Sequence, residues 1–133
     1  MKRIVATFYS APSGREPVRE WLLELAQQDR KIVGKEIATV EYGWPLGMPT
    51  CRPLRDGILE VRSTIRSGKV EARTYFAIER SMMLLLHGVE GKRGQKEAIA
   101  LALERLSDHR KRQKTAKRDE ASQGKVSHDR KRD

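Results

Sequence analysis

Two arginines and a tyrosine stand at alternating positions in two neighbouring segments of the chain. Arg62 lies in the segment 59–66, and Arg73 and Tyr75 lie in the segment 69–79. A guanidinium group is planar, permanently charged and able to bind a phosphate through two hydrogen bonds. A phenol beside it can stack on a nucleobase or pass a proton. These residue types therefore predict a site for the phosphate of a nucleic acid.

The two segments are expected to form a β-hairpin that brings these side chains together. Apolar and polar residues alternate along both segments, as they do in half-buried strands, and the two-residue turn Ser67-Gly68 lies between them. A turn of this length fixes the register of the two strands. Arg62 then faces Arg73, and Glu60 faces Tyr75, on the side of the sheet opposite the core.

Like charges directly across a ladder destabilise a sheet, with pair terms of about 0.2–1 kcal/mol. The facing arginines therefore predict a cationic patch that serves binding. Glu60 would orient one of the arginines, and Arg66 and Lys69, which flank the turn, would extend the patch as RNA contacts. The alternative is an exposed sheet face whose charges only keep the protein soluble. The residues by themselves favour these two interpretations about equally.

The face on which His87 lies depends on the length of one connection, in the stretch 79–81. A three-residue loop would pair His87 with Arg73 on the cationic face, whereas a two- or four-residue loop would turn it inward, opposite Thr74. Free histidine titrates near pH 6.5, so on the cationic face it would be a better base than a tyrosine. A histidine at the end of a strand is more often structural than catalytic.

The pair Lys92-Arg93, which follows Gly91, is a second candidate for a phosphate contact. The alternative for this pair is a solvated loop. Neither a glycine-rich phosphate loop nor a cluster of metal ligands occurs in the sequence, so no cofactor and no metal are expected.

The elements that must position these residues follow in the order β-α-α-β-β-β-α. The expected elements are a strand over 3–9, helices with apolar faces over 18–25 and 33–40, strands over 59–66, 69–79 and 82–88, and a helix over 99–106. Short connections between the last three strands imply an antiparallel meander. The predicted fold class is therefore α+β, a small antiparallel sheet with the helices packed on one face.

Local signals mark the ends of the first two helices. Ser13 with Glu16 fits a capping box, with a proline in the first turn. Asp29 is placed to cap the second helix, and Gly43 ends it. The prolines and glycine between positions 45 and 53 predict a loop.

The charge of the chain indicates a polyanionic partner. The 133 residues carry a formal net charge of +10, with 28 Lys and Arg against 18 Asp and Glu. We expect one domain over 1–108 and a basic tail over 109–133, either disordered or an extension of the last helix, because the tail has almost no apolar side chain to bury. A single cysteine and the lack of a long apolar run favour a cytoplasmic protein without a membrane partner.

Several stretches, taken in order, resemble the signature of the RelE/HigB/ParE toxin superfamily, and among its members the phage-derived HigB-like branch. These stretches are Pro53–Arg62, Arg73–Phe76, Leu84–Gly88, the Lys92-Arg93 loop and Glu97–Ala102. Their order and spacing carry the resemblance, which covers roughly residues 1–108. Val89 departs from it, since the family often has Phe there, and the loop 90–94 is shorter than the basic, Thr-Pro-containing loop of the family.

The resemblance implies a compact sheet with two N-terminal helices packed on it, and a toxin of a type II toxin–antitoxin module. Many such toxins cleave mRNA on the ribosome without a metal, and others poison DNA gyrase. The implied partners are the ribosome, mRNA and an antitoxin, expected to be a helix-turn-helix protein from the adjacent gene. The site residues that carry over are Glu60, Arg62, Arg73, Tyr75 and His87, with Lys92 and Arg93.

The favoured hypothesis is an endoribonuclease in which a 2′-OH attacks the adjacent phosphate. Arg62 and Arg73 would stabilise the charge on that phosphate, and His87 or Tyr75 would transfer protons. The alternatives are a gyrase poison and an inactive nucleic-acid-binding relative, and a His87 that points into the core would favour these two.

Overall fold

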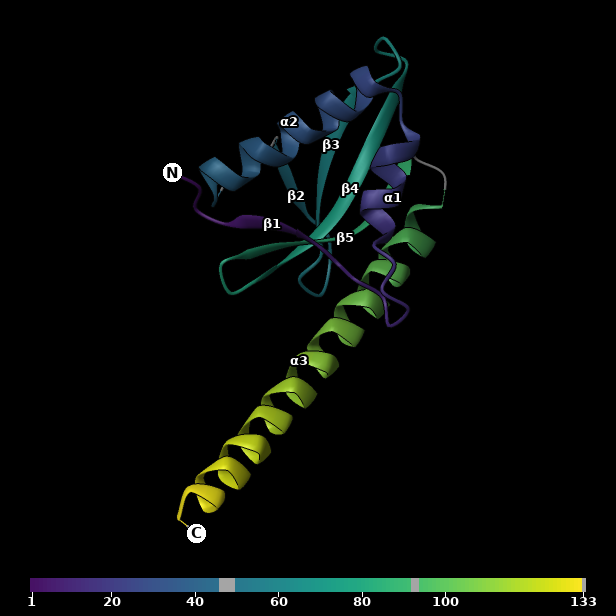
Figure 1. Cartoon of the computed structure of the whole chain (residues 1–133). Helices are drawn as coiled ribbons and strands as arrows, with labels where there is room; N and C mark the ends of the chain where they lie inside the picture. The colour runs from purple at the N-terminus through teal and green to yellow at the C-terminus, as the bar shows by residue number, and fades with distance from the viewer. Residues whose placement is uncertain (46–49, 92–93, 133) are drawn as a thin grey trace.

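A five-stranded sheet with the strand order β1-β5-β4-β3-β2 forms the centre of the protein (Figure 1). The computed structural model describes residues 1–45, 50–91 and 94–132. The elements are β1 (Val5–Phe8), α1 (Pro17–Glu24), α2 (Gln27–Gly43), β2 (Cys51–Pro53), β3 (Leu59–Ile65), β4 (Val70–Glu79), β5 (Met82–Glu90) and α3 (Gln95–Arg132). The α+β class and the order of the predicted elements are confirmed.

The two edges of the sheet differ from the predicted meander. β1 pairs with β5 in the parallel direction, so the sheet is mixed, and only the pairs β2–β3, β3–β4 and β4–β5 are antiparallel. The short strand β2 lies inside the stretch predicted to be a loop. It ends at Pro53, which lacks a backbone N–H, and a strand with a proline is tolerated at the edge of a sheet because its outer side needs no ladder.

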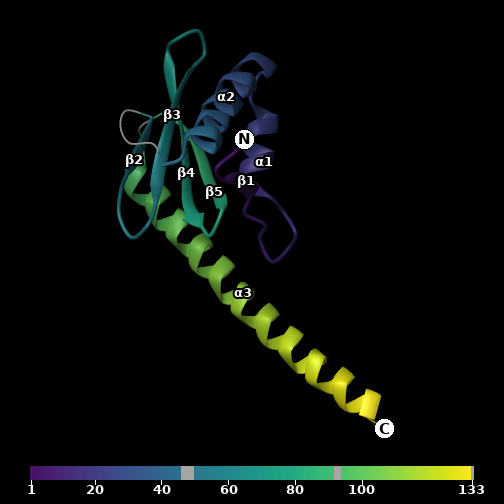
Figure 2. The same ribbon diagram turned by 90° about the vertical axis from the view of Figure 1, so that its left-hand side faces the viewer.

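Helices cover both faces of the sheet, so the prediction that they share one face is wrong. Figure 2 shows α1 and α2 together on one side, while α3 begins on the other side and continues past the sheet. The core under α1 and α2 includes Val18, Val33, Ile37, Val61 and Phe76. A second core under α3 is built from Tyr75, Leu84, Leu86, Ala98, Ala102, Leu106 and their neighbours. Apolar side chains are therefore buried on both faces of the strands, and the α3 core lies on the face predicted to meet solvent.

The ends of the first two helices differ from the predicted caps. Glu16 is the N-cap of α1, Pro17 opens the helix, and no side chain caps it. Ser13 lies too early to cap α1, and its Oγ accepts instead from a loop N–H two residues on, at 3.3 Å. α2 begins two residues before Asp29. Asp29 Oδ1 accepts from the backbone N–H of Arg66 at 3.1 Å, which ties α2 to the tip of the β3–β4 hairpin.

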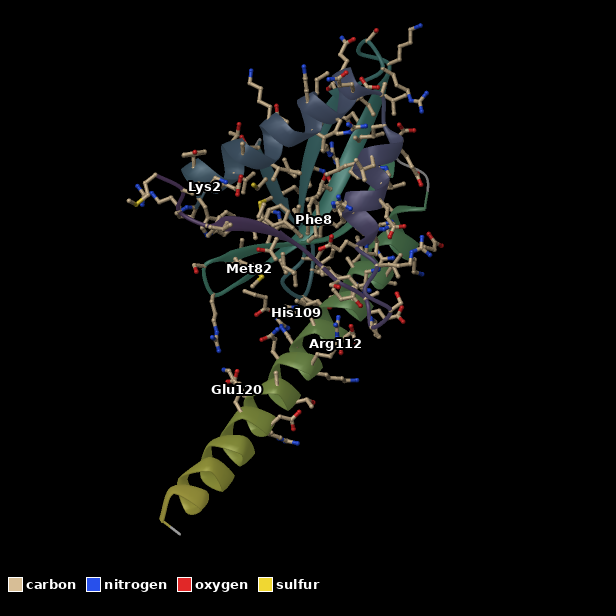
Figure 3. The ribbon with its side chains drawn as sticks, viewed as in Figure 1. Lys2, Phe8, Met82, His109, Arg112 and Glu120 are labelled. Carbon is tan, nitrogen blue, oxygen red and sulfur yellow. The ribbon has the colours of Figure 1, made fainter. Side chains whose placement is uncertain are left out.

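The basic C-terminal stretch continues α3 as one helix to Arg132, and its first turn still packs on the body of the protein. Tyr9 donates from its hydroxyl to Asp108 Oδ2 at 2.7 Å, and Arg112 Nη2 lies 2.7 Å from the same carboxylate. The side chains of residues 113–121 are exposed. Figure 3 shows Arg112 beside the body and Glu120 on the projecting part of the helix. No helix in the described part of the chain is long and apolar enough to cross a bilayer.

Candidate functional site

The hairpin of β3 and β4 has the predicted register. Arg62 pairs with Arg73, and Glu60 pairs with Tyr75. The turn is longer than predicted, because residues 66–69 all lie outside the two strands. Three of them have positive φ angles, between 51° and 85°, a conformation that the glycine at position 68 adopts without strain. The register is still the predicted one, because Ile65 and Val70, the residues directly before and after the turn, pair with each other.

The predicted cationic patch is not a patch on the solvent face, because Glu60 divides the two arginines. Arg62 Nε donates to Glu60 Oε1 at 2.6 Å, and Arg73 Nη1 donates to Glu60 Oε2 at 3.1 Å. Glu60 is 1% exposed and Arg73 is 2% exposed. The expectation of two exposed, mutually repelling arginines is therefore wrong, since a buried carboxylate between them turns repulsion into a pair of ionic hydrogen bonds.

Each of the three guanidinium nitrogens of Arg73 contacts a protein oxygen. Besides Glu60, its Nε donates to the carbonyl oxygen of Gly91 at 3.2 Å, and its Nη2 lies 3.5 Å from Glu71 Oε2. The side chain of Arg62 is 33% exposed, and its Nη1 lies 3.9 Å from Glu71 Oε2. The hydrogen bond to Glu60 raises the pKa of Arg62. Arg62 is thus anchored at Nε and one-third exposed, whereas Arg73 is buried, so of the two arginines Arg62 is the one placed to meet a phosphate.

His87 lies on the same face as this arginine pair, although the connection before it is short. Glu79 pairs with Met82, so only Arg80 and Ser81 join β4 to β5. In a regular ladder this two-residue connection would place His87 opposite Thr74, facing α1 and α2. The register instead shifts within β5, and this shift, which the sequence does not predict, decides the face on which His87 lies.

A β-bulge at Leu86 turns His87 to the other face. Phe76 pairs with Leu85, and Tyr75 pairs with His87, so Leu86 is the extra residue of β5. The rings of Tyr75 and His87 are stacked, with centroids 6.0 Å apart and planes inclined by 21°. The bulge therefore brings together the histidine and the tyrosine that the sequence analysis singled out.

Burial controls the protonation of both rings. Tyr75 is fully buried, and its hydroxyl has no hydrogen-bond partner among the described residues. Burial, followed by the charge of Glu60, raises the pKa of Tyr75. Burial, followed by the charge of Arg105, lowers the pKa of His87. At neutral pH the tyrosine is a protonated phenol and the histidine a neutral imidazole, so the histidine is the better proton-transfer group of the two.

A cavity of about 480 Å³ lies beside His87, between the loop after β1, α1, the end of β5 and α3. Its lining residues are Ala11, Ser13, Arg15, Pro17, Glu20, Trp21, Glu24, His87, Gly88 and Arg105. The volume suits a nucleotide-sized ligand. Gly88 and Trp21 pack closely at the floor of this cavity. A Cβ atom at position 88 would lie 2.1 Å from the indole ring, so only glycine fits there.

Arg105 is a site residue that the sequence analysis missed. Its Nη1 donates to the carbonyl oxygen of Leu86 at 2.7 Å and lies 3.4 Å from Nδ1 of His87. The one signal in the sequence was its position, because it directly precedes the apolar position Leu106 on the helix predicted to pack on the sheet. The contact of this helix with His87 depends on the bulge in β5, which the sequence does not reveal.

The remaining predicted RNA contacts lie away from the arginine pair or outside the described residues. Arg66 is exposed at the hairpin tip, where its Nη2 lies 2.8 Å from Glu90 Oε2. Lys69 is exposed at the same tip. Lys92 and Arg93 lie outside the described residues. Among the residues that are described, no group of three or more His, Cys, Asp or Glu side chains is placed to hold a metal ion.

Residues 20–107 match the family described as phage derived protein Gp49-like (DUF891). The chain belongs to this Gp49-like family. The family is of the RelE/HigB toxin type. The match runs from α1 into α3, so the arginine pair, the bulge and Arg105 lie within the Gp49-like part of the chain. No curated protein matches the chain.

Proposed function

We propose that this Gp49-like protein is the toxin of a type II toxin–antitoxin module and cleaves mRNA on the ribosome, as a member of the HigB-like branch. The observation that carries the proposal is the partly exposed guanidinium of Arg62, anchored by the buried Glu60 on the sheet face that also bears the Tyr75–His87 stack. Membership of a family of the RelE/HigB type supports the same reaction class.

The proposed reaction is an internal transesterification of RNA. The 2′ oxygen bonds to the adjacent phosphorus, the bond from phosphorus to the 5′ oxygen breaks, and a 2′,3′-cyclic phosphate and a 5′-hydroxyl result. One proton leaves the 2′ oxygen and one reaches the 5′ oxygen, so the reaction is balanced without a co-reactant. Negative charge grows on the phosphate oxygens during the attack, and Arg62 would stabilise it.

The buried residues have supporting roles in this proposal. Arg73 and Glu60 hold Arg62 in place, so Arg73 is a positioning residue rather than a phosphate ligand. Tyr75 supports the ring of His87 by stacking. The remaining role falls to His87, which would move protons or donate a hydrogen bond to the reacting phosphate.

The second candidate function is a protein that poisons DNA gyrase through contact alone. The burial of Arg73 and Tyr75 favours it, because two of the four predicted catalytic side chains do not reach the surface. A binding poison needs a surface and no proton-transfer groups, and fold alone does not separate the two functions.

The deciding experiment is primer-extension mapping of mRNA incubated with purified ribosomes and the protein. We expect the wild-type chain to cleave mRNA only when ribosomes are present, and Arg62→Gln to lower the cleavage rate by about 10²-fold or more. Arg19→Gln is the matched control, because Arg19 is an exposed arginine of α1 outside the site. Intact mRNA together with gyrase-dependent DNA breakage would establish the second function instead.

The toxin assignment has a separate test in cells. Expression of the chain should arrest growth, and co-expression of the adjacent gene should restore it. Normal growth with soluble, verified protein would contradict toxicity whatever the biochemical target.

A further inference from the structure

We propose that Arg105 is a positioning residue that holds His87 as a neutral imidazole with its proton on Nε2, so that His87 meets its ligand as a hydrogen-bond donor and not as a base. The state of the ring is a property of the free protein. The identity of the ligand, an RNA phosphate oxygen, rests on the proposed function.

The argument begins with the place where α3 meets the bulge of β5. The Nη1 atom of Arg105 donates to the carbonyl oxygen of Leu86, the extra residue of the bulge, at 2.7 Å. This short hydrogen bond fixes the guanidinium beside the next residue of the strand. The same Nη1 atom lies 3.4 Å from Nδ1 of His87.

The chemistry of arginine then sets the tautomer of the ring. A guanidinium has five N–H donors and no acceptor, and it keeps its proton in proteins. A protonated Nδ1 would set two N–H donors against each other, so the nitrogen that faces Arg105 carries its lone pair. In a neutral imidazole the proton is then on Nε2, at the opposite edge of the ring.

The positive charge of Arg105 acts on His87. The guanidinium lies over the ring of Tyr9, with its Cζ atom 5.9 Å from the centroid. Burial and this charge both lower the pKa of His87. The imidazolium form, which would need a second proton on Nδ1, is therefore disfavoured at neutral pH.

The other groups around His87 do not reverse this effect. From β4, Tyr75 stacks on the ring as a protonated phenol. From the loop before α1, Arg15 binds the Glu20 carboxylate of α1 through two hydrogen bonds. Glu24 of α1 also lines the cavity but is exposed, so its charge is screened by water.

A histidine in this state has a restricted chemistry. It donates from Nε2 to an oxygen, and it does not accept the 2′-hydroxyl proton, because its only lone pair faces Arg105. At the reacting phosphate it would add a neutral donor to the charge of Arg62. The interpretation of His87 as the base, favoured on free pKa values alone, is replaced by that of a hydrogen-bond donor.

Nitrogen-15 NMR of the histidine rings in the full chain tests the proposal without RNA. The His87 signals are assigned by their loss in His87→Gln. We expect the wild-type Nε2 to carry a proton and Nδ1 to carry none at pH 7.5, and the ring to titrate below pH 6.5. A proton on Nδ1 at pH 7.5 would overturn the proposal, whatever the protein does to mRNA.

Variants of Arg105 test the cause. Arg105→Met keeps the apolar stem over Tyr9 and removes the charge and the donors, so the titration midpoint of His87 should rise and both tautomers should appear. Arg105→Lys should restore the wild-type signals in part. Arg110→Met is the control, because it removes an arginine of the same helix that pairs with Glu79.

The outcomes separate the proposal from its alternatives. An unchanged His87 spectrum in a folded Arg105→Met variant would show that burial alone determines the tautomer and the pKa of His87, and would overturn the role of Arg105. If Arg105→Met does not fold, the proposal is tested by the spectrum of Arg105→Lys and by the tautomer of His87 in the wild-type chain. Wild-type signals as expected, with no cleavage of mRNA, would leave the proposal standing and contradict the proposed function.

Discussion

Arg73 donates a hydrogen bond from Nη1 to Oε2 of Glu60 across 3.1 Å, and both side chains are buried. Removing one partner of a buried pair leaves an imperfectly compensated charge. We expect Arg73→Ala to lower the free energy of unfolding by about 2–4 kcal/mol, less than for an isolated pair because Arg62 still binds Glu60. Chemical denaturation measures the change.

Arg62→Ala is the matched comparison for this prediction. Its side chain is one-third exposed and Arg73 still neutralises Glu60, so the cost should stay within about 1 kcal/mol. Equal stability of the two variants would contradict the assignment of Arg73 as a buried structural partner. The like-charge argument from the sequence predicted the reverse, that loss of Arg73 would be neutral or stabilising.

Gly88→Ala should disturb the floor of the cavity. The added Cβ would lie 2.1 Å from the Trp21 ring, so the indole or β5 must move. Overpacking of this kind costs about 1–3 kcal/mol. Gly34→Ala is the control, because apart from the adjoining backbone of its own helix nothing lies within 4 Å of the new Cβ, and alanine stabilises a helix interior by about 1 kcal/mol. Thermal melts that move in the same direction for both variants would contradict the close contact.

The stability of the protein should depend on pH through His87. Its pKa in the folded chain is lowered, whereas in the unfolded chain it is near 6.5, so below pH 6.5 the unfolded chain binds more protons. The free energy of unfolding should therefore fall as the pH drops from 6.5 through the folded pKa of His87. His87→Gln should flatten this part of the profile, and a profile of the same slope in wild type and variant would exclude His87 as its source.

Two truncations should separate the packed part of α3 from its projecting part. A chain ending at Lys114 keeps the contacts of Arg112 and Asp108 and should melt as the full chain does, while its binding to nonspecific RNA weakens and depends less on salt. A chain ending at Ser107 leaves the buried Tyr9 hydroxyl without Asp108 and should melt at a lower temperature. Equal melting temperatures for the two truncated chains would contradict this boundary.

Local rules predicted the pairing of the hairpin but not its surroundings. The turn fixes which residues of β3 and β4 face each other, so Arg62 opposite Arg73 could be foreseen. The burial of Arg73 could not, because it depends on a carboxylate two positions before Arg62 and on a carbonyl from the loop after β5. A pattern of charges along a strand does not reveal which of them are neutralised by distant parts of the chain.

The site around His87 shows the same limit. The sequence identifies the residue types but does not determine the face of His87, because that face depends on the length of one connection. The answer comes from a bulge eleven positions after the tyrosine, which no propensity marks. Arg105 was missed for the same reason, since its role exists only where α3 crosses that bulge.

The bulge means that β5 has one residue more than its ladder can pair, and an alternative register would place this extra residue further along the strand. A slip of that kind would place His87 opposite Thr74, where Gly88 now lies. The indole of Trp21, which leaves no room for a Cβ there, leaves none for an imidazole. Trp21 of α1 therefore excludes this slipped register sterically, and we expect a smaller side chain at position 21 to make the slipped register accessible.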